Sequence, residues 1–317
     1  MRGLLMTRVA AIDCGTNSIR LLIADVAGRD GELIDVDRRT EIVRLGQDVD
    51  RTGRLHPDAL ARTIAMARSY GELITAAGAA RIRFVATSAT RDAANREEFA
   101  AGVVAAVGVR PEVISGSEEA TLSFLGASAS LRAAKGPVVD VPAPYLVVDI
   151  GGGSTEFVLG TDEAEAARSV DIGCVRLTER HLRSDPPTAA QVAAARADIG
   201  RALNEVAGTV PVHTTRTLVG LAGSVTTVAA LALGLSRYDS TRIHHAHIPA
   251  AEVHAVTARL LDLTHAERAA LGPMHPGRVD VIGAGALILS ETVTRVGVAA
   301  VIASEHDILD GIVRSLA

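Results

Sequence analysis

The sequence predicts an α/β protein of two similar halves, each beginning with a sheet and ending with helices. One motif occurs twice: an apolar strand runs into an aspartate and a glycine-containing turn, at residues 13–18 and again at 149–154. Short strand patterns follow both turns, as in an antiparallel meander. A chain of 317 residues, 48% of them hydrophobic, is also long enough for about two domains with a core each.

These two segments, here called the first turn (13–18) and the second turn (149–154), suit phosphate. Glycine lets the backbone approach a ligand closely, and N–H groups in a concave turn attract anions. A carboxylate such as Asp149 at the entrance can hold the accompanying cation. Seven residues after each aspartate the copies differ, with Arg20 in the first and Glu156 in the second. We interpret this difference as a difference in role, in which the first copy binds phosphate and the second binds a metal or a water molecule.

The first half begins with strands expected over 8–13, 19–26 and 32–40. His56-Pro57-Asp58 then opens an amphipathic helix to about residue 77, and a strand follows over 82–86. Residues 87–93 are expected to form a loop at the end of that strand, where open α/β sheets place ligands, so Arg91 is a candidate phosphate clamp. The alternative is an ordinary loop in which Asp92 caps a helix and Arg91 is solvated.

Ser115 and Glu118 fit a capping box that opens a helix over 121–131. That role accounts for Glu118 and leaves Glu119 as a candidate for chemistry, although Glu119 can equally favour the helix dipole. Residues 133–144 are rich in Pro, Ala and Gly, which predicts a surface loop or short hairpin, with a hinge as an alternative.

In the second half, strands are expected before and after the second turn, at 145–148, 157–160 and 166–171. The helical patterns that follow cover 173–182, 188–206, 250–261, 266–271 and 279–296. Residues 217–227 combine a strand, small residues and a helix start, a pattern suited to phosphate or ribose. Arg278, at the head of an apolar helix, is a candidate anion contact. His244–His247 has metal-like spacing without a cysteine or carboxylate partner, which favours an exposed histidine cluster.

Composition excludes several function classes. A net charge of −5 argues against a general nucleic-acid surface. Cys14 and Cys174 are interpreted as small buried hydrophobes in a reducing compartment, so the cytoplasm is expected. The uncharged run 218–235 is broken by Gly-Ser and predicts a strand and a helix rather than a membrane span. Residues 1–6 are too short for a secretory signal, and the start is either Met1 or Met6.

The motifs together resemble the exopolyphosphatase and guanosine pentaphosphate phosphohydrolase (Ppx/GppA) family, in its short two-domain form. They follow the family order over nearly the whole chain, at residues 13–18, 44–46, 87–93, 115–120, 149–156, 220–227 and 278–282. The resemblance implies two ribonuclease-H-like domains of the actin, sugar-kinase and heat-shock-chaperone superfamily, 1–124 with 304–317 and 125–303, around an interdomain cleft. It also implies a C-terminal helix that returns to the first domain. Ile308–Gly311 departs from the usual family pattern by lacking one basic residue, which bears on affinity for long chains.

The family's activity implies a metal-assisted phosphoanhydride hydrolase that releases orthophosphate from the end of inorganic polyphosphate. Glu119 corresponds to the proposed general base. Asp149, Glu156 and Asp13 are expected to hold Mg²⁺ or Mn²⁺, and Gly223 and Ser224 are expected near a nucleoside. The residues expected to bind phosphate are Gly15, Asn17, Ser18, Arg20, Arg91, Gly151, Gly152, Ser154 and Arg278.

Three alternatives remain open from sequence. The first is a phosphohydrolase acting on guanosine pentaphosphate (pppGpp), a regulatory nucleotide of the stringent response. The second is a catalytically weak alarmone or polyphosphate sensor, and the third is a sugar or acetate kinase, for which the chain is short. Neither nucleic acid nor membrane is an expected partner, and a homodimer is one candidate assembly.

Overall fold

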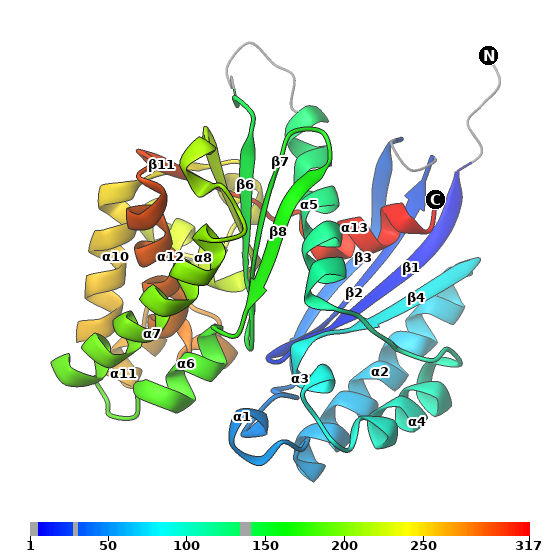
Figure 1. Ribbon diagram of the computed structural model, residues 1–317. Helices are drawn as coiled ribbons and strands as arrows, with labels where there is room; N and C mark the ends of the chain where they lie inside the picture. Colours follow the sequence, from blue (N-terminus) through cyan, green and yellow to red (C-terminus); the bar gives the residue numbers. More distant parts are fainter. Residues whose placement is uncertain (1–5, 28–30, 134–140) are drawn as a thin grey trace. The chain divides into compact units, whose positions relative to one another are not determined.

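Figure 1 shows a computed structural model of the protein, which describes residues 6–27, 31–133 and 141–317. The chain divides into two compact units, Met1–Ala129 with Ile308–Ala317, and Ser130–Asp307. The unit limits at 129 and 307 lie a few residues beyond the predicted domain limits at 124 and 303. Most of the loop predicted over 133–144 lies outside the described residues, and so does Met1 as the alternative start.

The first unit contains a five-stranded sheet of order β3-β2-β1-β4-β5. β1, β2 and β3 form the predicted antiparallel meander, and β4 and β5 continue the sheet in parallel with β1. The strands are β1 (Thr7–Cys14), β2 (Ser18–Val26), β3 (Leu33–Ile42), β4 (Arg81–Ala86) and β5 (Glu112–Val113). The helices are α1 (Val49–Thr52), α2 (Pro57–Ala77), α3 (Ser88–Arg91), α4 (Arg96–Val107), α5 (Gly116–Ala133) and α13 (Ile308–Ser315).

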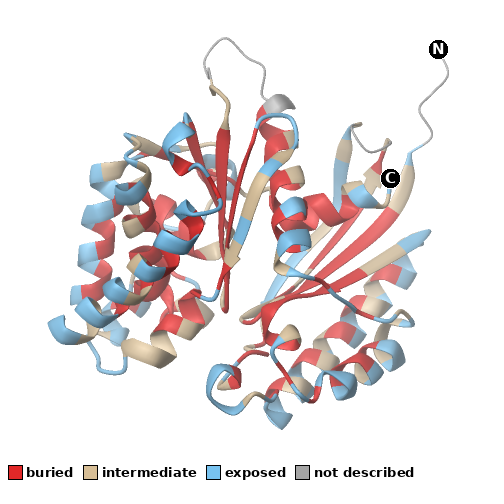
Figure 2. Ribbon diagram, in the orientation of Figure 1, coloured by how far each residue is buried: buried red, intermediate tan, exposed pale blue. Residues whose placement is uncertain are grey.

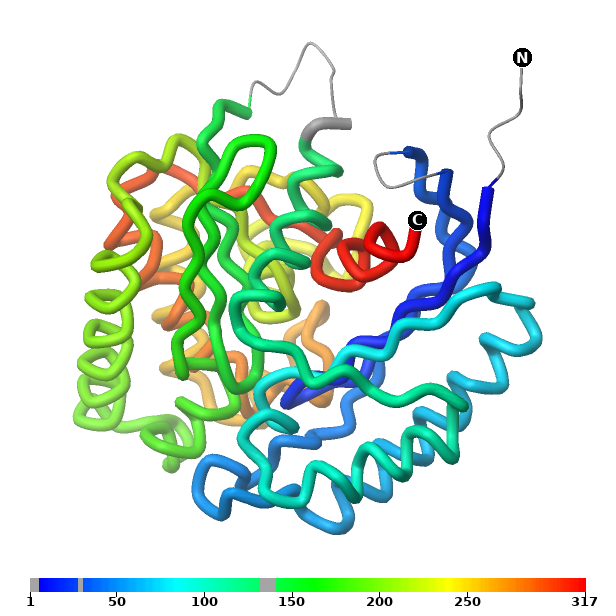
Figure 3. Tube along the Cα trace, turned by 45° about the vertical axis from the view of Figure 1, so that its right-hand side comes forward, coloured from blue at the N-terminus to red at the C-terminus, as the bar shows by residue number. Residues whose placement is uncertain are grey.

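Both faces of strands β1 and β2 are largely buried. Successive side chains of a strand point to opposite faces, so neighbouring residues pack against different helices. Ala10 and Ile12 of β1 pack with α2 and α4, whereas Val9 and Ala11 pack with α13. Figure 2 accordingly draws most of β1 and β2 as buried. Figure 3 shows α13, at the red end of the chain, beside these strands. The last helix of the chain therefore completes the core of the first unit.

An ion pair joins α13 to β3. Arg38 donates from Nη2 to Asp310 at 2.7 Å, and Asp310 is only 1% exposed. Burial lowers the pKa of Arg38, but Asp310 and then Asp35 raise it by more, so the guanidinium stays charged. Asp310, at the acidic position of the family pattern, thus has a structural partner within its own unit.

We expect Arg38→Ala to lower the free energy of unfolding by roughly 3–5 kcal/mol, because the substitution removes the guanidinium that pairs with the buried Asp310 carboxylate. Denaturant titration would measure this change. Arg39→Ala is the matched control, since Arg39 is about half exposed and pairs with Asp37. Its expected effect is within the scatter of the titration, because exposed ion pairs contribute little to stability. Equal losses in the two variants would contradict the importance of the buried pair.

The second unit contains a six-stranded sheet of order β10-β11-β9-β6-β7-β8. Its strands are β6 (Tyr145–Ile150), β7 (Thr155–Gly160), β8 (Ala164–Val170), β9 (Thr217–Leu221), β10 (His247–Pro249) and β11 (Ala300–Ala303). The order β8-β7-β6-β9-β11 repeats the order β3-β2-β1-β4-β5, with the antiparallel meander again followed by parallel strands. The structure therefore confirms the predicted duplication.

Helices pack with this second sheet into one large core. The helices of the second unit are α6 (Cys174–His181), α7 (Ala189–Ala207), α8 (Ala222–Ala232), α9 (Ser240–Ile243), α10 (Ala250–Asp262), α11 (His265–Ala269) and α12 (Ile282–Val296), with 3-10 helices at Val212–Thr214 and Pro276–Arg278. The run 218–235 is divided between β9 and α8, as expected. Among the described residues, no helix has the length and apolar character needed to cross a membrane.

Several elements differ from the sequence expectations. Residues 87–93 contain the short helix α3 rather than a simple loop. Helix α5 begins at Gly116, five residues before the expected start, because Ser115 Oγ accepts from the Glu118 N–H at 3.2 Å. The Glu118 side chain does not complete the capping box by bonding back to Ser115; it forms an ion pair with Arg83 at 2.7 Å instead. Helix α4 and strands β10 and β11 were not predicted. The two strands contain only three or four residues, which is too few to show a periodic pattern.

The histidine segment 244–247 is less exposed than expected. The rings of His244 and His245 stack at a centroid distance of 3.7 Å, and His306 stacks on His244 at 4.6 Å. His245 Nε2 lies 3.1 Å from Ser130 Oγ. Burial lowers the pKa of His245, and His306 and His247 lower it further.

Because the fold disfavours protonation of His245, we expect the protein to become less stable as the pH is lowered. The unfolded chain takes up a proton as the pH drops through about 6.5, while the folded chain does not, so protonation favours unfolding. Unfolding free energies at about pH 7.5 and about pH 5.5 would measure this loss. His245→Asn should reduce it, and asparagine tolerates the left-handed backbone at this position (φ 62°). His213→Asn, on an exposed residue, should retain it; an unchanged pH slope in His245→Asn would contradict the assignment.

Candidate functional site

The two turns share one backbone geometry. Gly15 N–H donates to the Ser18 carbonyl at 2.9 Å, and Gly151 N–H donates to the Ser154 carbonyl at 3.0 Å. Each turn joins the first two strands of its meander. The repeat recognised in the sequence is therefore a repeat in structure, although each copy is described here within its own unit.

The cross-strand partner of each aspartate distinguishes the copies. Asp13 lies opposite Arg20, whose Nε and Nη2 donate to Asp13 Oδ2 at 3.0 and 2.7 Å. Asp149 lies opposite Glu156, and the two residues are 7% and 1% exposed. Glu156 Oε1 accepts from Ser169 Oγ at 2.8 Å. The first copy thus places an ion pair where the second places two buried carboxylates.

The carbonyls of the second turn are held by the start of α6. Gly151 accepts from the Cys174 N–H at 3.0 Å, and Gly152 accepts from the next two N–H groups at 2.9 and 3.1 Å. The Gly153 carbonyl accepts from Arg176 Nε at 2.7 Å. In a planar trans peptide the C=O and N–H point in opposite directions. The N–H groups of residues 152–154 therefore point away from α6, and no acceptor within the described ranges bonds to them.

Close contact between backbones makes this arrangement possible. A Cβ on Gly173 would lie 2.4 Å from the carbonyl carbon and oxygen of Gly152 and 2.6 Å from the Gly153 nitrogen. Only glycine fits at position 173, because all three neighbours are backbone atoms that cannot rotate aside.

The first turn is held by the segment after β3 instead. The Thr16 carbonyl accepts from Gly46 N–H at 2.8 Å, and the Asn17 carbonyl accepts from the N–H groups of residues 43 and 44 at 3.1 and 2.9 Å. Thr16 Oγ1 lies 2.8 Å from Ser88 Oγ at the start of α3. The Asn17 side-chain oxygen is buried and accepts no hydrogen bond from the described residues.

Arg91 and Glu119 lie together in the first unit. Arg91 Nη1 donates to Glu119 Oε2 at 3.2 Å and to the Ile114 carbonyl at 2.9 Å. Glu119, on the first turn of α5, is 8% exposed. The alternative of a solvated Arg91 is wrong, because its guanidinium holds a buried carboxylate.

Arg278 lies across the start of α8. A Cβ on Gly223 would come within 2.2 Å of its guanidinium carbon, so a larger residue at 223 would displace the guanidinium. Arg278 Nη1 is 3.4 Å from both the Gly223 carbonyl and Thr227 Oγ1. Ser224 is buried against Gly285 of α12, beside Cys174. This packing accounts for Ser224, and its place near a nucleoside stays a prediction.

Both cysteines behave as buried hydrophobes. Burial raises the pKa of the Cys14 thiol well above its usual range, and Asp13 raises it further. Burial also raises the pKa of Cys174, although the hydrogen bond with Ser224 and the charge of Arg278 act in the opposite direction. Because the thiolate is the nucleophile, neither residue is poised for covalent chemistry at neutral pH.

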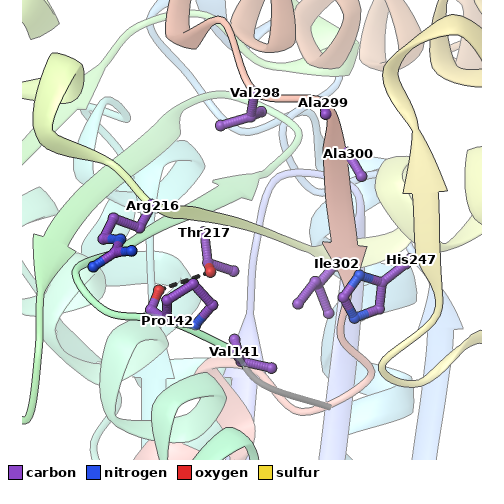
Figure 4. Close-up of a pocket in the computed structure, with 9 residues that line it drawn as sticks. All are labelled: Val141, Pro142, Arg216, Thr217, His247, Val298, Ala299, Ala300 and Ile302. Carbon is purple, nitrogen blue, oxygen red and sulfur yellow. Dashed lines mark hydrogen bonds between the residues drawn. The ribbon is translucent and has the colours of Figure 1, made fainter. Parts of the chain in front are cut away.

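A pocket of about 260 Å³ in the second unit lies elsewhere. It opens at the end of the sheet where β9 and β11 begin. The second turn lies at the opposite end of the strands, because it follows the end of β6, and β6 runs parallel to β9. Figure 4 shows Arg216 and His247 on opposite sides of it, and the bond from Thr217 Oγ1 to the Pro142 carbonyl, 2.8 Å, in its wall. None of the predicted site residues lines this pocket.

Sequence reasoning missed three residues that hold the turns, namely Gly46, Gly173 and Arg176. Each lies in the segment that follows the third strand of its meander. Comparing the two halves beyond the aspartate turns would have singled out these segments, since both begin soon after a meander ends and both contain a glycine and an arginine.

Two sheets that share the same order of five strands, each with an aspartate and glycine turn after the first strand of its meander, define a two-domain protein of the actin-like class. Residues 22–317 match the model of the Ppx/GppA phosphatase family. This chain belongs to that family.

Individual relatives agree with this assignment. The chain is 53% identical to exopolyphosphatase 2 of Mycobacterium tuberculosis, over 98% of this chain and 99% of that protein. A crystal structure of an exopolyphosphatase-like protein is 45% identical, with a TM-score of 0.92 over 98% of both chains. The Ppx/GppA family member of Aquifex aeolicus is 32% identical, with a TM-score of 0.81 over 98% of both chains.

Proposed function

We propose that this protein is an exopolyphosphatase that hydrolyses the terminal phosphoanhydride bond of inorganic polyphosphate and releases orthophosphate. The observation that carries the proposal is the second turn, whose carbonyls are held by α6 so that three N–H groups point the other way. A row of such donors suits a phosphate group. The relative named exopolyphosphatase 2, similar over nearly the full length of both chains, supports the same substrate.

Phosphoryl transfer requires mainly positioning and charge neutralisation from the protein. We assign phosphate binding to both turns and to three arginines. An arginine about 4 Å from a phosphate charge contributes about 4 kcal/mol at an effective dielectric near 20. The assigned residues are Gly15, Asn17, Ser18, Arg20, Arg91, Gly151, Gly152, Ser154 and Arg278.

Glu119 is assigned as the general base that takes a proton from the attacking water. Its contact with Arg91 supports this role, because a carboxylate held by a guanidinium stays in one orientation while it accepts the proton. A base in this role contributes about 10²–10⁴ to the rate.

The carboxylates of the second unit fit a magnesium or manganese ion. Asp149 and Glu156 offer oxygen donors from directly opposite strand positions. Mg²⁺ is usually bound by one or two carboxylates together with substrate phosphates and water, so a larger set of protein ligands is not required. Within the described part of the chain, no group of three or more His, Cys, Asp or Glu side chains is arranged to hold a metal. When bound, the ion neutralises charge on the phosphate oxygens; Asp13 as a further ligand remains a prediction.

A substrate panel tests the proposal. Orthophosphate release would be measured side by side from polyphosphates of defined length and from pppGpp, with Mg²⁺ or Mn²⁺. Faster release from polyphosphate is expected. Preference for pppGpp would replace the proposed substrate, and tight binding without turnover under either metal would identify a sensor. A cytoplasmic location and a homodimer also remain predictions.

A further inference from the structure

The two turns differ in what holds their third carbonyl. In the first turn, the Asn17 carbonyl accepts two backbone N–H groups, at 3.1 and 2.9 Å. The equivalent carbonyl of the second turn belongs to Gly153 and accepts from a side chain, Arg176 Nε, at 2.7 Å. The backbone N–H of Arg176 is already directed to Gly152 at 3.1 Å. A side chain therefore does in the second turn what the backbone does in the first.

We infer that Arg176 is a positioning residue for phosphate hydrolysis, which sets the peptide between Gly153 and Ser154 and so aims the Ser154 N–H at the substrate. The inference rests on the proposed function. Glycine at 153 places no Cβ restraint on the rotation of this peptide. The neighbouring carbonyls of Gly151 and Gly152 bond to backbone N–H groups of α6. The third peptide of the row depends on the guanidinium for its orientation.

The geometry of arginine suits this task. Nε belongs to a planar guanidinium whose donors keep fixed directions, and a hydrogen bond from a cation to a carbonyl is stronger than a neutral one. The bond also increases the polarisation of the peptide, which makes the opposite N–H a better donor to an anion. Arg176 thus acts through the backbone, without being assigned a contact with the substrate.

Arg176→Met tests the inference, because methionine keeps the apolar stem and removes the donor. We expect kcat/KM for polyphosphate to fall about ten- to a hundredfold, less than the loss of a complete oxyanion donor. Arg176→Lys, which retains a cationic donor, should recover part of the loss. Arg180→Met on the same helix is the matched control, since Arg180 reaches the Asp171 carbonyl and Asp198 rather than the turn. It should retain the wild-type kcat/KM.

Binding separates this inference from the proposed function. Calorimetric titration with inorganic tripolyphosphate, in a Glu119→Gln background to prevent turnover, should show weaker binding in Arg176→Met and partial recovery in Arg176→Lys. If the otherwise wild-type protein neither binds tripolyphosphate nor releases orthophosphate, the proposed function fails. If the wild type is active and Arg176→Met matches it in binding and kcat/KM, only the role of Arg176 is overturned. A thermal melt checks that each variant is folded, and equal losses in the Met and Lys variants would also count against a donor role.

Discussion

Glu119→Gln should lower kcat for orthophosphate release by about 10²–10⁴ while leaving polyphosphate affinity nearly unchanged. Glutamine keeps the size of the side chain, and its carbonyl oxygen can still accept from Arg91 Nη1, a contact of 3.2 Å in the native protein. The amide nitrogen cannot take a proton from water. Steady-state phosphate release and tripolyphosphate titration would separate the two effects.

The neighbouring residue provides the control. Glu118 lies on the same turn of α5 but binds Arg83, at 2.7 Å, and is about half exposed. Glu118→Gln should therefore leave kcat close to the wild-type value, with a stability change below about 1 kcal/mol. Wild-type turnover in Glu119→Gln would remove this residue from the mechanism, and an equal loss in both variants would show that the effect is structural.

Gly173→Ala is expected to produce the second large effect. The added methyl would lie 2.4 Å from backbone atoms of Gly152, so the second turn or the start of α6 must move. Overpacking of this kind costs about 1–3 kcal/mol of stability. Displacing the row of N–H donors should lower kcat/KM about a hundredfold, as removal of an oxyanion donor does.

The control for this variant is a glycine with open space around it. Gly200, inside α7, has no heavy atom within 4 Å of an added Cβ. Gly200→Ala should raise the free energy of unfolding by roughly 0.5–1 kcal/mol, because alanine favours a helix over glycine, and should leave activity unchanged. Thermal unfolding and phosphate-release assays on both variants would measure this. An active, undisturbed Gly173→Ala would refute the close packing of α6 on the second turn.

Much of the fold was predictable because its signals are local. Alternating apolar residues and the glycine turns identified both meanders, and these features act within about ten residues of chain. The short strands β10 and β11 were missed for the converse reason. Their three or four residues join a sheet only because longer strands from elsewhere in the chain are already there.

The amino-acid sequence by itself determined the duplicated order of strands, the two aspartate and glycine turns and the identity of the acidic and basic side chains near them. Tertiary structure alone decided which of these side chains meet. Arg91 contacts the Glu119 carboxylate, which lies 28 positions later in the chain, and Arg176 contacts the Gly153 carbonyl, which lies 23 positions earlier. Such pairs leave no periodic trace, because hydrogen bonds and ion pairs depend on distance and direction in space. These contacts form only when the packing of the helices brings the two segments of chain together.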